Sequence, residues 1–118
     1  MLHISGIVVQ GEQRGRVLGY PTANIDIKKK KLHVSPGIFA GWAILEKVRY
    51  MAAVFIPETL DRAEAHLLDY SGQSFYGKHI ELEVIQKVSE IERYDTIEEL
   101  KEKIRSDVEL VREMLGKA

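Results

Sequence analysis

The segment from Gly11 to Asn24 combines residue types that suit the binding of phosphate and magnesium. It reads GEQRGRVLGYPTAN, with three glycines, two arginines and two small oxygen-bearing side chains near its end. Glycine lets backbone N–H groups approach an anion closely, and arginine offers forked donors to phosphate oxygens. Thr22 and Asn24 can each offer an oxygen to Mg²⁺, and in an extended segment both side chains point to one side because they are two residues apart. The segment therefore predicts a phosphate and magnesium site.

No single residue of this segment is diagnostic. The Gly-x-x-x-Gly-Arg spacing is common, a Walker A Gly-Lys-Ser/Thr motif is lacking, and no Gly-x-Gly-x-x-Gly follows the first expected strand. An isolated arginine such as Arg16 is more often a surface charge, and a Thr or Asn in a loop with proline more often stabilises a turn. The prediction depends on the order of the whole segment.

Short apolar and alternating runs around this segment predict β-strands. Two of the runs are separated only by Glu46 and Lys47, which indicates a tight antiparallel hairpin, although Glu-Lys is an unusual pair for such a turn. Residues 10–37 are too long for a simple connection, and loops of that length are usually functional or disordered. The runs that predict strands are 2–9, 23–27, 38–45, 48–55, 63–70 and 79–87.

The spacing of apolar residues changes to three and four from Ile97 to Leu115, which predicts an amphipathic helix with charges on its other face. Thr96 and Glu99 have the spacing of a capping box at its start. Gly116 is placed to end the helix.

Antiparallel strands followed by one helix predict a mainly β fold, a small barrel with the helix packed against it. A single domain is expected over residues 1–118, because this length suffices for one hydrophobic core. Four large aromatic residues on the apolar strands are expected in that core: Phe39, Trp42, Tyr50 and Phe55.

Composition excludes several classes of function. Lys and Arg number 17 against 18 Asp and Glu, so the net charge of −1 predicts no nucleic-acid or membrane partner, and Lys28–Lys31 is expected to be a solvated turn. Without cysteine there is no disulfide or thiolate chemistry. The start of the chain lacks the features of a secretory signal, so a cytoplasmic location is expected. The four histidines lack close metal-ligand spacing: His3, His33, His66 and His79.

The string Gly-Arg-x-Leu-Gly-Tyr-Pro-Thr-Ala-Asn at residues 15–24 closely resembles the signature of riboflavin kinases, the ATP-dependent enzymes that make FMN. The resemblance continues in the family's order and covers nearly the whole chain. Its further segments are Ser35–Phe39, Ala63–Tyr70, Phe75–Lys78 and the helix start Asp95–Leu100.

The resemblance implies a six-stranded Greek-key antiparallel β-barrel with a C-terminal amphipathic α-helix. It also implies transfer of the γ-phosphate of MgATP to the 5′-hydroxyl of riboflavin, which gives FMN and ADP. Riboflavin and ATP are the expected partners, Mg²⁺ is the expected ion, and the protein is expected to be a monomer. Bacterial relatives commonly carry an FMN adenylyltransferase domain before the kinase, whereas this chain starts at the kinase strand, so no FAD synthesis is expected.

Site residues follow from the matching positions. Glu64 matches the catalytic carboxylate, which would accept the proton of the riboflavin hydroxyl. Thr22 and Asn24 match the magnesium ligands. Tyr76 and Gly77 suit a turn and are candidates for contact with the flavin. The residues expected to bind the nucleotide and its phosphates are Gly11, Gly15, Arg16, Gly19, Tyr20, Pro21, Thr22 and Asn24.

Two regions depart from the family pattern. Residues 52–59 replace a stretch that usually reads like Gly-x-Asn-Pro-Thr-Phe. Before the final helix, Ser89 and Ile91 stand where the family usually has an Arg and a Glu that help to hold flavin and nucleotide. Two alternatives therefore stay open: a catalytically weak flavin- or nucleotide-binding module, and a kinase for a related flavin or polyol. Another cation at the position of the missing Arg, such as Arg62 or Arg93, would favour the enzyme.

Overall fold

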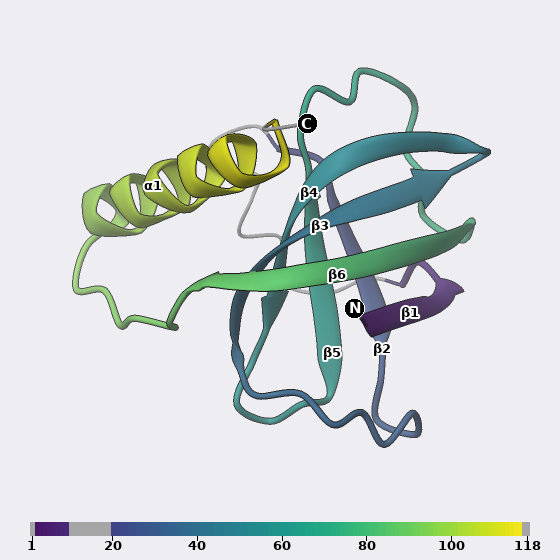
Figure 1. The fold of residues 1–118 in the computed structure, drawn as a ribbon, viewed down its shortest axis with the longest axis horizontal. Helices are drawn as coiled ribbons and strands as arrows, with labels where there is room; N and C mark the ends of the chain where they lie inside the picture. Colours follow the sequence, from purple (N-terminus) through teal and green to yellow (C-terminus); the bar gives the residue numbers. More distant parts are fainter. Residues whose placement is uncertain (1, 10–19, 117–118) are drawn as a thin grey trace.

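The computed structural model of the protein describes residues 2–9 and 20–116. In this part of the chain six strands form one antiparallel sheet in the order β1-β6-β3-β4-β5-β2, and the sheet curls into a nearly closed barrel (Figure 1). The elements are β1 (Leu2–Ile7), β2 (Thr22–Asp26), β3 (Gly37–Leu45), β4 (Val48–Ile56), β5 (Arg62–Leu67), β6 (His79–Ser89) and α1 (Ile97–Leu115). The mainly β barrel with a C-terminal helix, expected from the sequence, is confirmed.

The two edge strands of the sheet meet just beyond the end of β1. Val9 forms an isolated antiparallel bridge with Asn24, in which the Val9 N–H donates to the Asn24 carbonyl at 2.8 Å. β2 therefore pairs with β5 along one edge, and at Asn24 its other edge is hydrogen-bonded to Val9.

The main hydrophobic core fills the interior of the barrel, because alternate residues of each strand point inward. On β5, Ala63, Ala65 and Leu67 belong to this core, so Glu64 and His66 face outward. Other inward side chains from the remaining strands include Ile4, Ile25, Phe39, Val54, Ile80 and Leu82.

Helix α1 packs across the outside of β3, β4 and β6 (Figure 1). Its apolar stripe, predicted from the spacing of the sequence, forms a second cluster with outward residues of the barrel. The buried members of this cluster are Ala40, Ala53, Leu68, Ile104, Val108 and Val111. The helix thus covers one part of the outer surface. Within the described part of the chain, no helix has the combination of length and apolarity needed to cross a membrane.

The ends of α1 follow the sequence prediction with two differences. The Thr96 hydroxyl accepts from the Glu99 N–H at 3.1 Å, as a capping residue should. The Glu99 carboxylate, however, accepts from the Asp95 N–H at 2.9 Å, one residue before the position of a capping box. Gly116 ends the helix with right-handed backbone angles, so the left-handed conformation common at this position is not used.

The predicted hairpin forms, and its turn shows why the turn pair is unusual. Leu45 pairs with Val48, which leaves Glu46 and Lys47 as a two-residue loop with φ values of 50° and 70°. Both residues thus adopt the left-handed conformation that favours Gly or Asn. The expectation that Trp42 lies in the core was wrong. It is half-buried on the outer face of β3, and the Arg49 guanidinium lies 4.5 Å from its ring centre.

We expect Thr96→Ala to lower the free energy of unfolding by about 1 kcal/mol, because the Glu99 N–H loses its acceptor at the start of the helix. Chemical denaturation followed by circular dichroism measures this change. Ser106→Ala is the matched control, because Ser106 is exposed in the middle of the same helix and alanine has the higher helix propensity. Equal stability of the Thr96 variant and wild type would contradict a capping role.

A second prediction concerns acid pH. Arg112 in the last turn of α1 donates hydrogen bonds of 2.8 and 2.9 Å to Asp69, which follows β5, and these bonds hold the pKa of the Asp69 carboxyl below its usual value of 3.8. A carboxyl with a lowered folded-state pKa stabilises the fold above its unfolded pKa, and this contribution is lost as pH falls through the folded value. Asp69→Asn should therefore lower Tm most at neutral pH. The difference should begin to shrink near pH 3.8 and vanish as pH falls through the lower folded-state pKa.

Thermal unfolding of both proteins from pH 7 down to pH 3 measures this effect. Glu109→Gln is the control, because Glu109 is an exposed carboxylate of α1 with no ion pair among residues 2–9 and 20–116. A difference in Tm between wild type and Asp69→Asn that stays constant over this pH range would rule out the ion pair as its cause.

Candidate functional site

Three pairs of polar residues face each other across β2 and β5 on the outer side of the barrel. Residues directly opposite in antiparallel strands have their side chains on the same face, with Cβ atoms about 4.5–5.5 Å apart. The pairs are Thr22 with His66, Asn24 with Glu64, and Asp26 with Arg62. The structure therefore brings the two predicted metal ligands and the predicted catalytic carboxylate onto one surface.

Glu64 is a buried carboxylate held by an arginine. Its side chain is 0% exposed, and Oε2 accepts a hydrogen bond from Arg62 Nε at 3.1 Å. Arg62 lies two residues earlier on β5, so strand geometry puts both side chains on the same face. A buried carboxylate costs several kcal/mol unless it is paired, and the guanidinium offsets part of that cost. The arrangement keeps a carboxylate in a fixed position beside Asn24.

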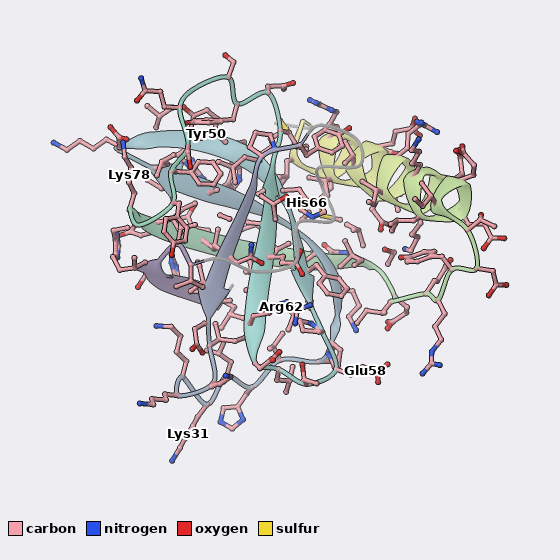
Figure 2. All side chains as sticks on the ribbon, turned by 180° about the vertical axis from the view of Figure 1, so that it is seen from behind. Lys31, Tyr50, Glu58, Arg62, His66 and Lys78 are labelled. Carbon is pink, nitrogen blue, oxygen red and sulfur yellow. The ribbon has the colours of Figure 1, made fainter. Side chains whose placement is uncertain are left out.

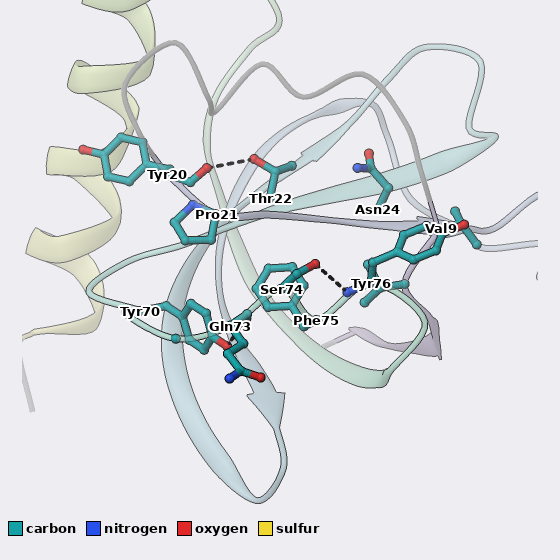
Figure 3. Close-up of a pocket in the computed structure, with 12 residues that line it drawn as sticks. Val9, Tyr20, Pro21, Thr22, Asn24, Tyr70, Gln73, Ser74, Phe75 and Tyr76 are labelled. Carbon is teal, nitrogen blue, oxygen red and sulfur yellow. Dashed lines mark hydrogen bonds between the residues drawn. The ribbon is translucent and has the colours of Figure 1, made fainter.

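Asn24 offers an oxygen that the described part of the protein does not use. The residue is 2% exposed, and its Oδ1 has no hydrogen-bond partner among residues 2–9 and 20–116. A buried acceptor without a partner costs about 1–3 kcal/mol, so such an oxygen fits a role in binding a ligand. On the same side of β2, the Thr22 hydroxyl donates only a long bond of 3.3 Å to the Tyr20 carbonyl (Figure 3).

These two oxygens fit a magnesium ion that is also bound to a nucleotide. Mg²⁺ prefers oxygen ligands and usually keeps waters and substrate phosphates in its shell, with few ligands from the protein. Among the residues that the structure describes, no three His, Asp or Glu side chains gather in a way that could hold a metal. A metal at Thr22 and Asn24 would therefore take its other ligands from phosphate and water.

A pocket of about 200 Å³ opens beside Thr22 and Asn24 (Figure 3). One wall comes from the start of β2 and the residues before it, and the other from the loop between β5 and β6. Its lining residues are Val8, Val9, Tyr20, Pro21, Thr22, Asn24, Tyr70, Gly72, Gln73, Ser74, Phe75 and Tyr76. Four of the residues predicted to bind nucleotide thus share one pocket with Tyr76, the predicted flavin contact.

Aromatic contacts support the loop that lines this pocket. The rings of Tyr70 and Phe75 lie 5.3 Å apart, and Tyr50 on β4 meets Tyr70 edge-on at 5.2 Å. The Tyr70 hydroxyl donates to the Gln73 carbonyl at 2.7 Å. Gly77 is not among the lining residues. It has φ 84° and belongs to a turn in which the Lys78 N–H donates to the Phe75 carbonyl, as expected for a turn glycine.

A second, narrow cavity lies between the barrel and α1. Its volume is about 30 Å³, and it is mainly apolar, with a few polar side chains at its edges. Its lining residues are Ile38, Ala53, Phe55, His66, Tyr94, Leu100, Ile104, Asp107 and Val108. Figure 2 shows His66 on the part of β5 nearer to α1, and Arg62 farther away.

Strand register connects the two cavities through Glu64. Asn24 lies opposite Glu64 on one side, and Phe55 of β4 lies opposite Glu64 on the other. Asn24 lines the first pocket and Phe55 lines the second. The three side chains therefore form one row across β2, β5 and β4, with the buried carboxylate in the middle. Glu64 thus lies between a residue of one cavity and a residue of the other, although its own side chain lines neither of them.

Some predicted site residues lie outside the part of the chain that the structure describes, and some cavity residues were not predicted. Gly11, Gly15, Arg16 and Gly19 lie outside the described residues. Most residues of the second cavity are not recognisable from the sequence, because they come from four separate elements and the segment before α1. The polar and aromatic stretch 71–78, between two predicted strands, is the feature of the sequence that could have indicated the first pocket.

Comparison with known proteins shows the family of the chain. A family model described as Flavokinase, riboflavin kinase, matches residues 1–115. The chain is 33% identical over 111 residues to the trifunctional protein RibF/MnmA of Mycoplasmoides gallisepticum and 31% identical over 122 residues to the bifunctional riboflavin kinase/FMN adenylyltransferase of Escherichia coli K12. The alignments cover 89% and 96% of this chain but 17% and 38% of those relatives, so the chain spans less than half of either one.

A solved structure supports the same assignment. The crystal structure of riboflavin kinase from Trypanosoma brucei matches with a TM-score of 0.76 and 26% sequence identity, over 98% of this chain and 77% of that one. The family model covers nearly the whole chain, and the fold matches that of the Trypanosoma brucei enzyme. The chain belongs to the riboflavin kinase family.

Proposed function

We propose that this protein transfers the γ-phosphate of MgATP to the 5′-hydroxyl of riboflavin and releases FMN and ADP. The observation that carries the proposal is the row of Asn24, Glu64 and Phe55, which places a buried carboxylate between a pocket of mixed polar and apolar lining and a mainly apolar cavity. Membership of the riboflavin kinase family supports it, because these enzymes use ATP as the phosphate donor, generally with a divalent metal ion.

The nucleotide is assigned to the pocket beside β2. The Thr22 hydroxyl and the side-chain oxygen Oδ1 of Asn24 would hold Mg²⁺. When bound, this ion would neutralise charge on the phosphate oxygens of ATP. Gly11, Gly15, Arg16 and Gly19 precede this pocket in the chain and are proposed to bind the phosphates through backbone N–H groups and a guanidinium. Tyr20 and Pro21 line the same pocket. Its polar side therefore receives the charged end of the nucleotide.

The acceptor is assigned to the apolar cavity between the barrel and α1. An aromatic ring system gains free energy there by burial against Phe55 and Leu100. The cavity of about 30 Å³ is far smaller than a flavin, so binding requires the wall to open. Residues 90–96, which join β6 to α1, have no helix or strand, so they are suited to move. Tyr76 lines the pocket assigned to the nucleotide, and Gly77 lines neither cavity. Contact of these two residues with the flavin therefore stays a prediction.

Glu64 is proposed to act as the general base. It would accept the proton of the riboflavin 5′-hydroxyl as that oxygen forms a bond to the γ-phosphorus, while the bond from the γ-phosphorus to the bridging oxygen of ADP breaks. The hydrogen bond from Arg62 holds the carboxylate during this step. Positioning and charge neutralisation carry most of phosphoryl transfer, and a placed base adds about 10²–10⁴-fold.

We expect Glu64→Gln to lower kcat for FMN formation by about 10²–10⁴-fold, because glutamine keeps the shape of the side chain but cannot accept the proton at neutral pH. Formation of FMN from riboflavin and MgATP, followed by chromatography, measures the change. Glu58→Gln is the control, because Glu58 is exposed in the turn after β4 (Figure 2). An unchanged kcat in Glu64→Gln would contradict the assigned role, and flavin binding by wild type without turnover would favour a binding module.

Removal of the Asn24 oxygen should have opposite effects on activity and stability. Asn24→Leu should raise the Mg²⁺ concentration for half-maximal activity by about tenfold or more, because one metal ligand is lost. The same substitution should raise the stability of the ligand-free protein by about 1 kcal/mol, because a buried acceptor without a partner among the described residues disappears. Magnesium titrations and thermal unfolding without ligands measure the two effects.

Asp26→Asn is the control for this pair of measurements, because Asp26 is an exposed residue of the same face of β2. Chelation of the metal with EDTA should abolish wild-type activity, and added Mg²⁺ should restore it. An Asn24→Leu variant with the wild-type Mg²⁺ requirement would remove Asn24 from the metal site.

A further inference from the structure

A buried polar cluster joins the end of β6 to α1. Lys103 Nζ donates to Ser89 Oγ at 2.7 Å and to Asp107 Oδ1 at 2.8 Å, and Ser89 Oγ donates to the same Asp107 oxygen at 2.6 Å. Lys103 and Asp107 are one turn apart on the helix, so their side chains lie on the same face. Each of the three groups is within hydrogen-bond distance of the other two.

The ion pair between Lys103 and Asp107 is more deeply buried than the other two ion pairs within α1. The side chains of Lys103 and Asp107 are 9% and 8% exposed, whereas the pairs Lys101–Glu98 and Arg105–Glu102 are largely in solvent. A buried ion pair is often no more stabilising than apolar side chains of similar volume, because desolvation cancels the attraction between the charges. Stability alone therefore does not explain these charges in the interface between helix and barrel.

The cluster lies at the edge of the cavity assigned to the acceptor. Asp107 is one of the residues that line this cavity, together with Phe55 and His66. Both hydrogen bonds within the cluster go to its Oδ1, and Oδ2 makes no hydrogen bond with any residue in the described ranges. An ionised carboxylate only accepts hydrogen bonds. A ligand in the cavity with an N–H or O–H group could therefore use this second oxygen.

The ammonium group of Lys103 also lies beside Ser89, a position where the family resemblance leads one to expect a cationic side chain. Ser89 is the position at which the family resemblance leads one to expect an arginine, and Arg62 and Arg93 were the candidates to replace it. Arg62 donates to Glu64, and Arg93 is exposed before the helix. The cation that reaches the Ser89 side chain is the ammonium group of Lys103, which comes from α1 instead of β6.

We infer that Lys103 is a positioning residue of the acceptor site. Held by Ser89, its ammonium group fixes the Asp107 carboxylate so that Oδ2 accepts a hydrogen bond from an N–H or O–H group of the acceptor. The inference rests on the proposed function, since it uses the assignment of the acceptor to this cavity. Through this carboxylate, α1 selects an acceptor whose apolar ring system carries an N–H or O–H group at its edge.

The test combines Lys103→Gln with the double variant Ser89→Arg, Lys103→Gln. In the single variant the affinity for riboflavin, measured by the quenching of flavin fluorescence, should fall by about tenfold or more, and the KM for ATP should stay within about twofold. The double variant puts a cation at the other end of the same cluster and should recover most of the riboflavin affinity. Lys101→Gln is the matched control, because Lys101 is paired with Glu98 on the solvent side of the same helix.

The outcomes separate the inference from the proposed function. Wild type that makes FMN, with a Lys103→Gln variant of unchanged riboflavin affinity, overturns the inference and leaves the function intact. A variant that loses riboflavin and ATP affinity together, with a lower Tm and no recovery in the double variant, shows a merely structural role and also overturns it. Wild type that binds riboflavin without turnover contradicts the function, while the selective loss and recovery of binding would still support the inference. Wild type that binds no riboflavin overturns both.

Discussion

The antiparallel pairing of β2 with β5 is the constraint on which the candidate site depends. It places Asn24 directly opposite Glu64 on the outer face, and the neighbouring Ala23 and Ala65 opposite each other in the core. A shift of the register by one residue would turn one strand over, and a carboxylate or an amide would then enter the apolar interior. The cost of that exchange is several kcal/mol, so the core itself holds the polar row in place.

The site keeps polar groups that the described part of the protein satisfies only in part. The side-chain oxygen Oδ1 of Asn24 is a buried acceptor without a hydrogen bond from the described residues, and Asn24 lines the pocket beside β2. The two carboxylates at the site, Glu64 and Asp107, each accept a hydrogen bond from a cationic side chain, Arg62 and Lys103 respectively. The buried Asn24 oxygen costs stability in the free protein, and a bound metal ion would recover that cost.

Helix α1 contacts the regions around both cavities. Its apolar face packs on Ala53 and Leu68, and its polar edge forms the cluster of Lys103 with Asp107 beside the acceptor cavity. At its other end Arg112 holds Asp69, which directly precedes the loop that lines the nucleotide pocket. Arg112 therefore links α1 to the start of the loop that lines the pocket beside β2, through a bidentate ion pair.

The strands, the helix with its Thr96 cap, the family and the spacing of Thr22 and Asn24 could all be predicted from the sequence. Each of them depends on residues close together in the chain or on an ordered motif. It did not determine which face of β3 turns inward, so Trp42 was expected in the core and lies outside it. The row of Asn24, Glu64 and Phe55, and the 2.7 Å contact of Lys103 with Ser89, became visible only in the folded protein. Strand register and helix packing are set by the burial of apolar faces, and they bring together side chains whose separation along the chain does not reveal that they meet.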